Sequence, residues 1–178
     1  MIIFLDFDGV LHPEFDPDDH ERLKQNSALF CRLPFIEEVL REFPQVEIVI
    51  SSAWRIHLGD PEEASRRLRT YFSGDIAQRI VGITPRYQFL NPREAKDGLG
   101  RFKRQWECEV WLNRHRPPGT RWMAMDDIAL SFRPGLENLM VFKSMEAFRQ
   151  EHQDPLRKYL VALTEGSPWP SNREKELK

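Results

Sequence analysis

Apolar residues along this chain form short continuous runs that alternate with longer stretches in which apolar and polar residues recur at helical spacing. Continuous apolar runs bounded by turn or polar residues are typical of buried strands. The runs predict strands at Ile2–Leu5, Val46–Ser51, Arg121–Asp127 and Leu139–Lys143, and a short apolar segment ending in a turn at Ile80–Pro85. Strands that alternate with helices form a parallel sheet covered on both faces. The predicted fold class is therefore α/β, a three-layer sandwich with a Rossmann-like parallel sheet.

Three amphipathic stretches predict the helices that connect these strands. The first, Leu33–Phe43, carries its apolar residues on one helical face. The second lies within residues 59–72, where Asp60 is a suitable N-cap and Pro61 occupies the first helical position. The third, Arg101–His115, has its aromatic and aliphatic residues on the inward side. Each of the three should pack an apolar face against the sheet.

Three of the predicted strands end in polar side chains. These are Asp6 and Asp8 after the first, Ser51 and Ser52 after the second, and Asp126 and Asp127 after the third. The carboxyl ends of parallel strands meet at one edge of the sheet, where ligands of open α/β folds bind. Carboxylates this close need a cation, and oxygen ligands without a Cys or His cluster favour Mg²⁺. The pattern predicts a magnesium and phosphate site in which Asp6 is free to act as a nucleophile and Asp8 as an acid and base.

Composition and charge narrow the classes of protein to which this chain can belong. The 178 residues suffice for one domain, and a net charge of −2 gives no overall field that favours nucleic acid or acidic membranes. Cys31 and Cys108 are far apart, so we expect two reduced thiols and no metal pair. No membrane-length apolar run or signal peptide is recognisable, which predicts a cytoplasmic location. We expect a domain over residues 1–165 and a loose tail over residues 166–178, which are rich in Pro, Ser and charge.

Other interpretations of these residues fit less well. An EF-hand calcium loop would need Gly at its sixth position and Glu at its twelfth, whereas Gly9 is fourth and Pro17 twelfth. His12 and His20 are interpreted as loop histidines rather than ligands, because the site is already rich in oxygen donors. The tryptophans are interpreted as core or groove-wall residues rather than platforms for stacked bases; they are Trp54, Trp106, Trp111 and Trp122.

Four segments, in this order, resemble the motifs of the haloacid dehalogenase (HAD) superfamily of phosphotransfer enzymes. They are FLDFDGVLH, IVISSAWR, RFKRQWECEVWL and WMAMDD, which together span Ile2 to Asp127. The first is quite specific, whereas the third, a basic residue on a helix, would mean nothing alone. SSAWR, VGITP and the helix ending in WL further resemble small bacterial members grouped with RNA-repair phosphatase domains.

The resemblance implies a role for each matching residue. Asp6 resembles the covalent nucleophile and a metal ligand, and Asp8 the general acid and base whose backbone carbonyl binds Mg²⁺. Asp127 resembles the Mg²⁺ ligand of the acidic pair, with Asp126 supporting it. Arg104 resembles the cation that offsets phosphoryl charge, by its distance before the WL of the helix, and Lys103 remains an alternative. Four residues are assigned to substrate binding: Gly9, Ser51, Ser52 and Arg55, with Ser52 a rival of Ser51 for the phosphate-binding hydroxyl.

Domain organisation bears on the substrate. HAD enzymes insert cap domains at either of two positions, but the gaps here, His12–Gln45 and Arg55–Arg101, are short for a folded lid. An open site suits nucleotides or nucleic-acid ends, and the stretch Arg86–Arg121 carries more basic than acidic residues. We therefore expect a phosphatase that forms an aspartyl-phosphate and acts on a phosphorylated small molecule or nucleic-acid end, without an obligate protein partner. A non-catalytic phosphate-binding module remains the alternative, and the sequence does not name the substrate.

Overall fold

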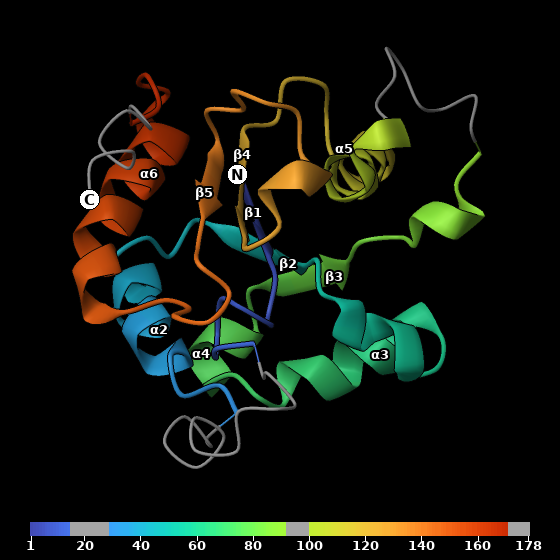
Figure 1. Cartoon of the computed structure of the whole chain (residues 1–178), viewed down its shortest axis with the longest axis horizontal. Coiled ribbons are helices and arrows are strands. Elements are labelled where there is room, and N and C mark those ends of the chain that lie inside the picture. The colour runs from blue at the N-terminus through green and yellow to red at the C-terminus, as the bar shows by residue number, and fades with distance from the viewer. Residues whose placement is uncertain (15–28, 92–99, 171–178) are drawn as a thin grey trace.

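The computed structural model describes residues 1–14, 29–91 and 100–170 (Figure 1). Its centre is a five-stranded sheet in the order β3-β2-β1-β4-β5, in which all neighbouring strands are parallel. The strands are β1 (Ile2–Leu5), β2 (Glu47–Ile50), β3 (Ile80–Ile83), β4 (Trp122–Asp126) and β5 (Leu139–Val141). The predicted parallel α/β sheet is confirmed, and the short apolar segment before Pro85 forms the edge strand β3.

The register of the sheet aligns the strands so that their carboxyl ends share one edge. In the centre, Ile3 of β1 lies opposite Ile48 of β2 and Met123 of β4. All four residues of β1 are buried, as expected of a strand covered on both faces. The apolar run that predicted β1 is thus the middle of the core.

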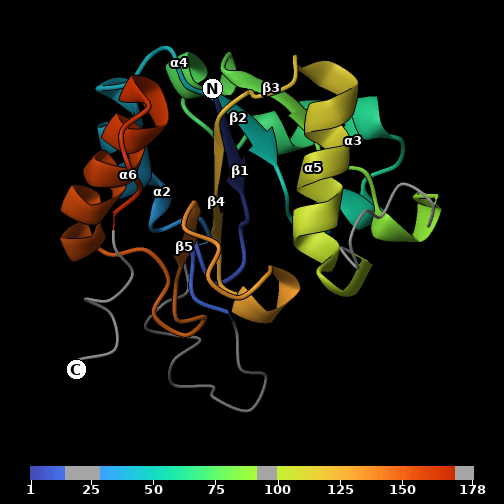
Figure 2. The same cartoon turned by 90° about the horizontal axis from the view of Figure 1, so that it is seen from above.

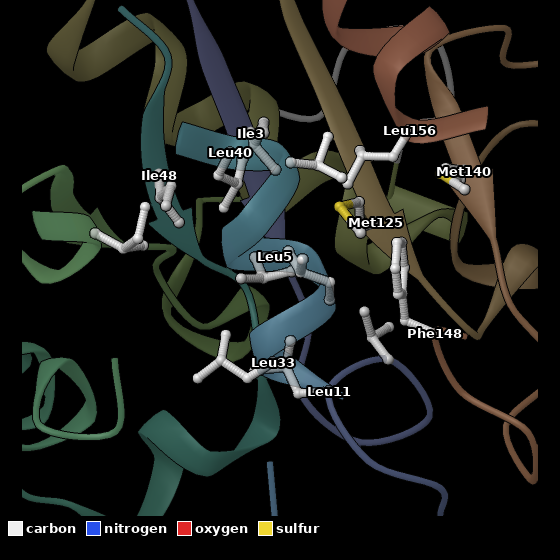
Figure 3. Close-up of a cluster of buried hydrophobic side chains, with 14 of the residues drawn as sticks. Ile3, Leu5, Leu11, Leu33, Leu40, Ile48, Met125, Met140, Phe148 and Leu156 are labelled. Atoms are coloured by element: carbon white, nitrogen blue, oxygen red, sulfur yellow. The ribbon is translucent and has the colours of Figure 1, made fainter. Parts of the chain in front are cut away.

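Helices cover the two faces of the sheet unequally (Figure 2). On one face lie α2 (Leu33–Arg41) and α6 (Gln153–Glu165), whose apolar residues join the larger hydrophobic cluster shown in part in Figure 3. On the other face lies α5 (Lys103–His115), where Trp111 and Cys108 pack against Phe4 and its neighbours. The three-layer arrangement is as predicted, although the sequence pattern had not indicated α6.

The segment between β2 and β3 contains two short helices, α3 (Pro61–Arg69) and α4 (Gly74–Ala77). The predicted N-cap is confirmed, because the Asp60 carboxylate accepts backbone hydrogen bonds from Glu62 and Glu63, both at 2.9 Å. Leu68 of α3 and Ile76 of α4 belong to the main core. In the described residues these helices therefore pack onto their own domain, and no large cap is present.

Residues 166–170, the start of the predicted tail, contact the domain. The Arg121 guanidinium lies 4.9 Å from the centre of the Trp169 ring and donates a 3.0 Å hydrogen bond to the Ser167 carbonyl. The domain boundary remains a prediction, and residues 171–178 lie outside the described part. Both cysteines are free. Within the described ranges, no helix has the length and apolar character needed to cross a membrane.

Candidate active site

The polar residues that follow β1, β2 and β4 meet at the carboxyl edge of the sheet. The backbone ladder continues one residue past each strand: Asp6 N–H donates to the Met125 carbonyl at 3.0 Å, and Ser51 N–H donates to the Leu5 carbonyl at 2.8 Å. Asp6, Ser51 and Asp126 each follow or end an apolar strand, and all three are buried although their side chains are polar. The sheet thus places these groups side by side, as the sequence predicted.

Three carboxylates form an acidic cluster at this edge: Asp6, Asp126 and Asp127. Each offers an oxygen atom, and these atoms lie within 4.8 Å of one another. Asp126 also accepts a 2.8 Å hydrogen bond from the Ile128 N–H, which fixes its orientation. Hard carboxylate oxygens at this spacing are a donor set that fits Mg²⁺. The residues expected to bind the metal through their side chains are therefore together.

Arg104 of α5 is the counter-charge of this cluster. Its Nη2 atom lies 3.1 Å from Asp6 Oδ2, its Nε atom lies 3.8 Å from Asp126 Oδ2, and it also donates to the Ser51 carbonyl. Lys103 points elsewhere, with its Nζ atom 4.5 Å from the centre of the Tyr87 ring. Of the two predicted cations, the structure brings Arg104 to the acids.

One guanidinium does not balance three clustered carboxylates. Burial raises the pKa of Asp6 to about 6, and Asp127 adds to the rise, whereas Arg104 and a 2.7 Å hydrogen bond from the Phe7 N–H oppose it. Burial and the charge of Asp6 raise the pKa of Asp126 well above its ordinary value. A further cation at this position would relieve the repulsion. The electrostatics agree with the donor set in favouring a metal.

Asp8 lies apart from the cluster and has a different environment. Its Oδ1 atom is 3.1 Å from His12 Nε2, and the Trp54 Nε1–H contacts both of its carboxylate oxygens at 3.0 Å. Burial raises the pKa of Asp8, but the hydrogen bonds from His12 and Trp54 outweigh this, so that the pKa is lowered overall. Two aspartates one residue apart therefore differ in the direction of their pKa shifts.

His12 and Trp54 are the contacts that sequence reasoning missed. The sequence predicts a loop histidine and a core or groove-wall tryptophan at these positions, whereas in the structure both side chains contact the Asp8 carboxylate. Trp54 lies on η1 (Ala53–His57), directly after β2, and His12 is buried near Trp54 and Phe30. The sequence held one signal, since SSAWR places a Trp in the loop that follows the second polar strand end. His20 lies outside the described residues.

Glycine is required at position 9 by the backbone conformation and by the closeness of Asp127. The φ angle of Gly9 is +66°, and a Cβ atom at this position would collide with the Asp127 carboxylate. A residue without a side chain therefore lets the first loop approach the acidic cluster closely. Its predicted contact with substrate remains a prediction.

The two serines after β2 face different groups. Ser51 Oγ lies 3.9 Å from Cys108 Sγ in the buried interface with α5. The Ser52 side chain is among the hydrogen-bonding groups that lower the pKa of Asp6. The Ser52 hydroxyl, rather than that of Ser51, therefore interacts with the nucleophile candidate. The role of either hydroxyl in binding phosphate stays a prediction.

Arg55, predicted to bind substrate, makes internal contacts. Its Nη2 atom lies 2.6 Å from Glu107 Oε2, and it also donates to the backbone carbonyls of Ser52 and Pro85. Glu107 in turn accepts a 2.8 Å hydrogen bond from the Tyr87 N–H. This buried ion pair joins the loops after β2 and β3 to α5, and so it fixes the helix that carries Arg104.

Basic residues of the stretch Arg86–Arg121 face different groups in the described part of the chain, and a basic rim that steers nucleic acid stays a prediction. Arg104 faces the acids, Arg116 pairs with Glu47 at 2.9 Å, and Arg121 contacts the chain beyond α6. Arg93 and Lys96 lie outside the described residues. The basic side chains near the site come instead from several separate elements.

Comparison with known proteins agrees with this architecture. No curated protein and no solved structure matches the chain significantly. A family model matches residues 2–161, from β1 to within α6, and thus covers the sheet and every residue of the acidic cluster. The family is described as the HAD domain in Swiss Army Knife RNA repair proteins. This chain, with its parallel sheet and paired acids at the strand ends, belongs to that family of HAD domains.

Proposed function

We propose that this protein is a Mg²⁺-dependent phosphomonoesterase that forms a covalent phosphate on Asp6. The observation that supports the proposal is the position of Asp6, between the Arg104 guanidinium at 3.1 Å and the carboxylates of Asp126 and Asp127. Asp6, Asp127 and Asp126 would hold the ion through their carboxylates. When bound, Mg²⁺ neutralises charge on the phosphoryl oxygens so that a carboxylate can approach them.

The two aspartates then divide the chemistry. A carboxylate oxygen of Asp6 attacks phosphorus, the bond from phosphorus to the ester oxygen breaks, and Asp8 gives that oxygen a proton. In the second step water attacks the same phosphorus atom and loses a proton to Asp8. The bond to Asp6 breaks, which releases phosphate and restores the carboxylate. Arg104 stabilises negative charge on the phosphoryl group throughout.

The lowered pKa of Asp8 suits one half of this cycle directly. The ionised carboxylate, held by His12 and Trp54, is ready to accept a proton from water. The acid half requires Asp8 to take up a proton first. A phosphate dianion bound nearby favours this uptake, because a neighbouring negative charge raises the pKa of a carboxyl group.

The substrate class that we propose is a phosphorylated nucleotide or nucleic-acid end. Two observations support it: the description of the family as a domain of RNA repair proteins, and the lack of a large cap in the described residues. A site without a lid accepts a phosphate that protrudes from a large molecule. Such a substrate can itself cover the site and exclude water.

The first test is hydrolysis of an aryl phosphate. EDTA should abolish turnover and added Mg²⁺ should restore it, because phosphate cannot approach the acidic cluster without the cation. Full activity in chelator would contradict the metal requirement. If phosphate binds in the presence of Mg²⁺ but no ester is hydrolysed, the protein is a phosphate-binding module instead.

The second test isolates the covalent step with Asp8→Asn. A good leaving group needs little protonation, so this variant should release a burst of phenol while phosphate stays on Asp6. Rapid-quench kinetics with mass spectrometry of the intact protein measures both products. Equal residual rates on good and poor leaving groups, with no adduct on Asp6, would mean that the carboxylates only hold metal.

A further inference from the structure

Three hollows lie along α3, β3 and α5, and one of them is lined by Arg104 of the candidate active site. Their volumes are about 190, 370 and 770 Å³. The smallest is lined by Arg104, and it shares Arg55 and Arg86 with the middle hollow. The middle and largest hollows share Thr84 and Arg114, among others. We call these three adjoining hollows together the α3–α5 groove; the three elements lie on one side of the molecule in Figure 2.

The lining of the α3–α5 groove is basic. Besides Arg55, its arginines come from separate segments: Arg66 and Arg69 from α3, Arg86 from the loop after β3, and Arg104 and Arg114 from α5. Two acids also line it in the described part of the chain. Glu107 is already paired with Arg55, which leaves Glu62 as the acid at the far end. Besides the Arg55–Glu107 pair, five arginines and one acid line the groove, so the lining itself is basic, although Arg104 also faces the acidic cluster and Arg66 also pairs with Glu63.

Buried polar atoms along the α3–α5 groove lack partners. Thr84 Oγ1, Ser65 Oγ and Arg69 Nε make no hydrogen bond within the described residues. Thr84 and Ser65 are at least nine-tenths buried, and both side chains line the groove. A buried hydroxyl without a partner is unfavourable, and a polar ligand in the groove would supply the missing bonds.

One exposed aromatic ring lines the middle hollow. Phe89 of η2 (Tyr87–Phe89) is 77% exposed, and the Arg86 guanidinium lies 5.9 Å from the centre of its ring. Rings beside guanidinium groups are the combination on which unpaired bases stack while phosphates are bound. An acidic peptide would use the arginines but gain little from this ring.

We propose that the α3–α5 groove binds the phosphodiester backbone of a single-stranded RNA whose terminal phosphate lies at Asp6. The proposal rests on the proposed function, because it treats Asp6 as the point where the strand ends. A mononucleotide would fill the hollow next to Arg104 but would leave the largest hollow, with Arg66, Arg69 and Ser65, empty. The strand should therefore be bound well beyond its reactive end.

Adjacent arginines on α3 give a matched test. Arg66 and Arg67 both pair with Glu63 and are exposed, but Arg66 lines the α3–α5 groove and Arg67 is not among its lining residues. We would measure binding of decamers of uridine with a 5′ or a 3′ phosphate, by fluorescence anisotropy in an Asp6→Asn background. Arg66→Gln should lower the slope of log affinity against log salt by about 0.7, the value for one lost phosphate contact of a single strand. Arg67→Gln should leave the slope unchanged, and equal slopes for both variants would overturn the proposal.

Kinetics with Asp6 intact distinguish the contribution of the groove from that of the reactive centre. The KM for a terminally phosphorylated decamer should be lower than that for the corresponding dinucleotide. Arg66→Gln should raise the KM for the decamer without changing the kcat for the decamer. Hydrolysis of aryl phosphate should be unaffected by Arg66→Gln, since that substrate does not reach α3. Equal KM values for decamer and dinucleotide, or equal competition by polyglutamate of matched charge, would contradict the proposal.

Thr84→Val separates a ligand-binding hydroxyl from a merely buried one. The exchange keeps the shape of the side chain and removes Oγ1. If the hydroxyl binds the strand, decamer affinity should fall while the melting temperature is maintained or rises. A higher melting temperature with unchanged affinity would show that Thr84 takes no part. Absence of aryl phosphatase activity would refute the proposed function alone, because decamer binding and its salt dependence are measured without turnover.

Discussion

Two buried arginine–carboxylate pairs lie at the same edge of the sheet and differ in almost every other respect. Arg55 and Glu107 are 2.6 Å apart, and each side chain also makes a hydrogen bond with a neighbouring backbone group. Arg104 and Asp6 are 3.1 Å apart, but two more carboxylates surround them. The first pair balances its charge internally, whereas the second belongs to a cluster with excess negative charge.

The two arginine side chains also differ in their exposure to solvent. The Arg55 side chain is 3% exposed and that of Arg104 is 13% exposed, so Arg104 retains access to solvent and to a bound phosphate. A closed pair holds segments together, because leaving either charge alone in the interior is costly. An unbalanced cluster beside a partly exposed guanidinium instead favours an external ion or ligand. The comparison suggests that Arg55 positions the loops and α5 while Arg104 and the acids act on substrate.

The largest effect should come from Asp6→Asn. An amide oxygen is a poor nucleophile, so turnover of every phosphate ester should fall below detection. The fold should persist, because the exchange removes one of several repelling carboxylates. Steady-state assays and circular dichroism measure the two properties, with Asp154→Asn on the exposed face of α6 as control. Residual turnover close to wild type would exclude Asp6 as the nucleophile.

Arg55→Ala should affect stability more than any single change in the acidic cluster. It leaves Glu107 buried without its partner, and breaking such a pair costs about 3–5 kcal/mol of unfolding free energy. Urea denaturation measures the loss. Replacing both residues with Met should cost less than Arg55→Ala, since no charge then remains unpaired. If Arg55→Ala is as stable as wild type, the pair does not hold the loops as we infer.

Arg104→Ala should damage catalysis and leave the closed pair intact. Loss of a cation that stabilises the transferred phosphoryl group should reduce kcat by about 10²-fold, as for other lost transition-state donors. Lys103→Ala, on the same turn of α5 but directed toward Tyr87, is the matched control and should retain activity. The opposite result would mean that Lys103 is the functional cation.

The smallest expected effect is the pH dependence of stabilisation by Mg²⁺. Burial raises the pKa of Asp6 to about 6 in the folded protein, whereas its unfolded pKa is about 4. Protonation of Asp6 therefore contributes to the free energy of unfolding below a pH of about 4, and this contribution is lost as pH rises to about 6. Mg²⁺ binds the ionised cluster and has to displace this proton at low pH. Saturating Mg²⁺ should raise the melting temperature by about 5–10 °C near pH 7.5 and by less near pH 5.

Calorimetry in Mg²⁺ and in EDTA at both pH values measures this difference. Asp127→Asn should reduce the shift at the higher pH, because it removes one of the clustered carboxylates. A shift of equal size at both pH values, or one unaffected by Asp127→Asn, would place the ion elsewhere.

Local patterns in the sequence determined the sheet, three of its helices and the polar residues at the strand ends. Ile2–Leu5 is apolar at every position because it is buried on both faces, and Asp60 and Pro61 mark the start of α3 by backbone requirements alone. Asp6, Asp126 and Asp127 could be placed together for the same reason, since parallel strands align their carboxyl ends.

Only the tertiary structure decided which side chains meet. Arg104 and Lys103 are neighbours on one helix and indistinguishable in charge, but the direction of α5 turns one to Asp6 and the other to Tyr87. The sequence likewise did not indicate that Arg55 pairs with Glu107, or that Trp54 contacts Asp8. These contacts join residues 46 to 98 positions apart, and no local periodicity encodes them. Residue spacing determines which face of an element a side chain occupies, whereas the packing of whole elements determines its partner.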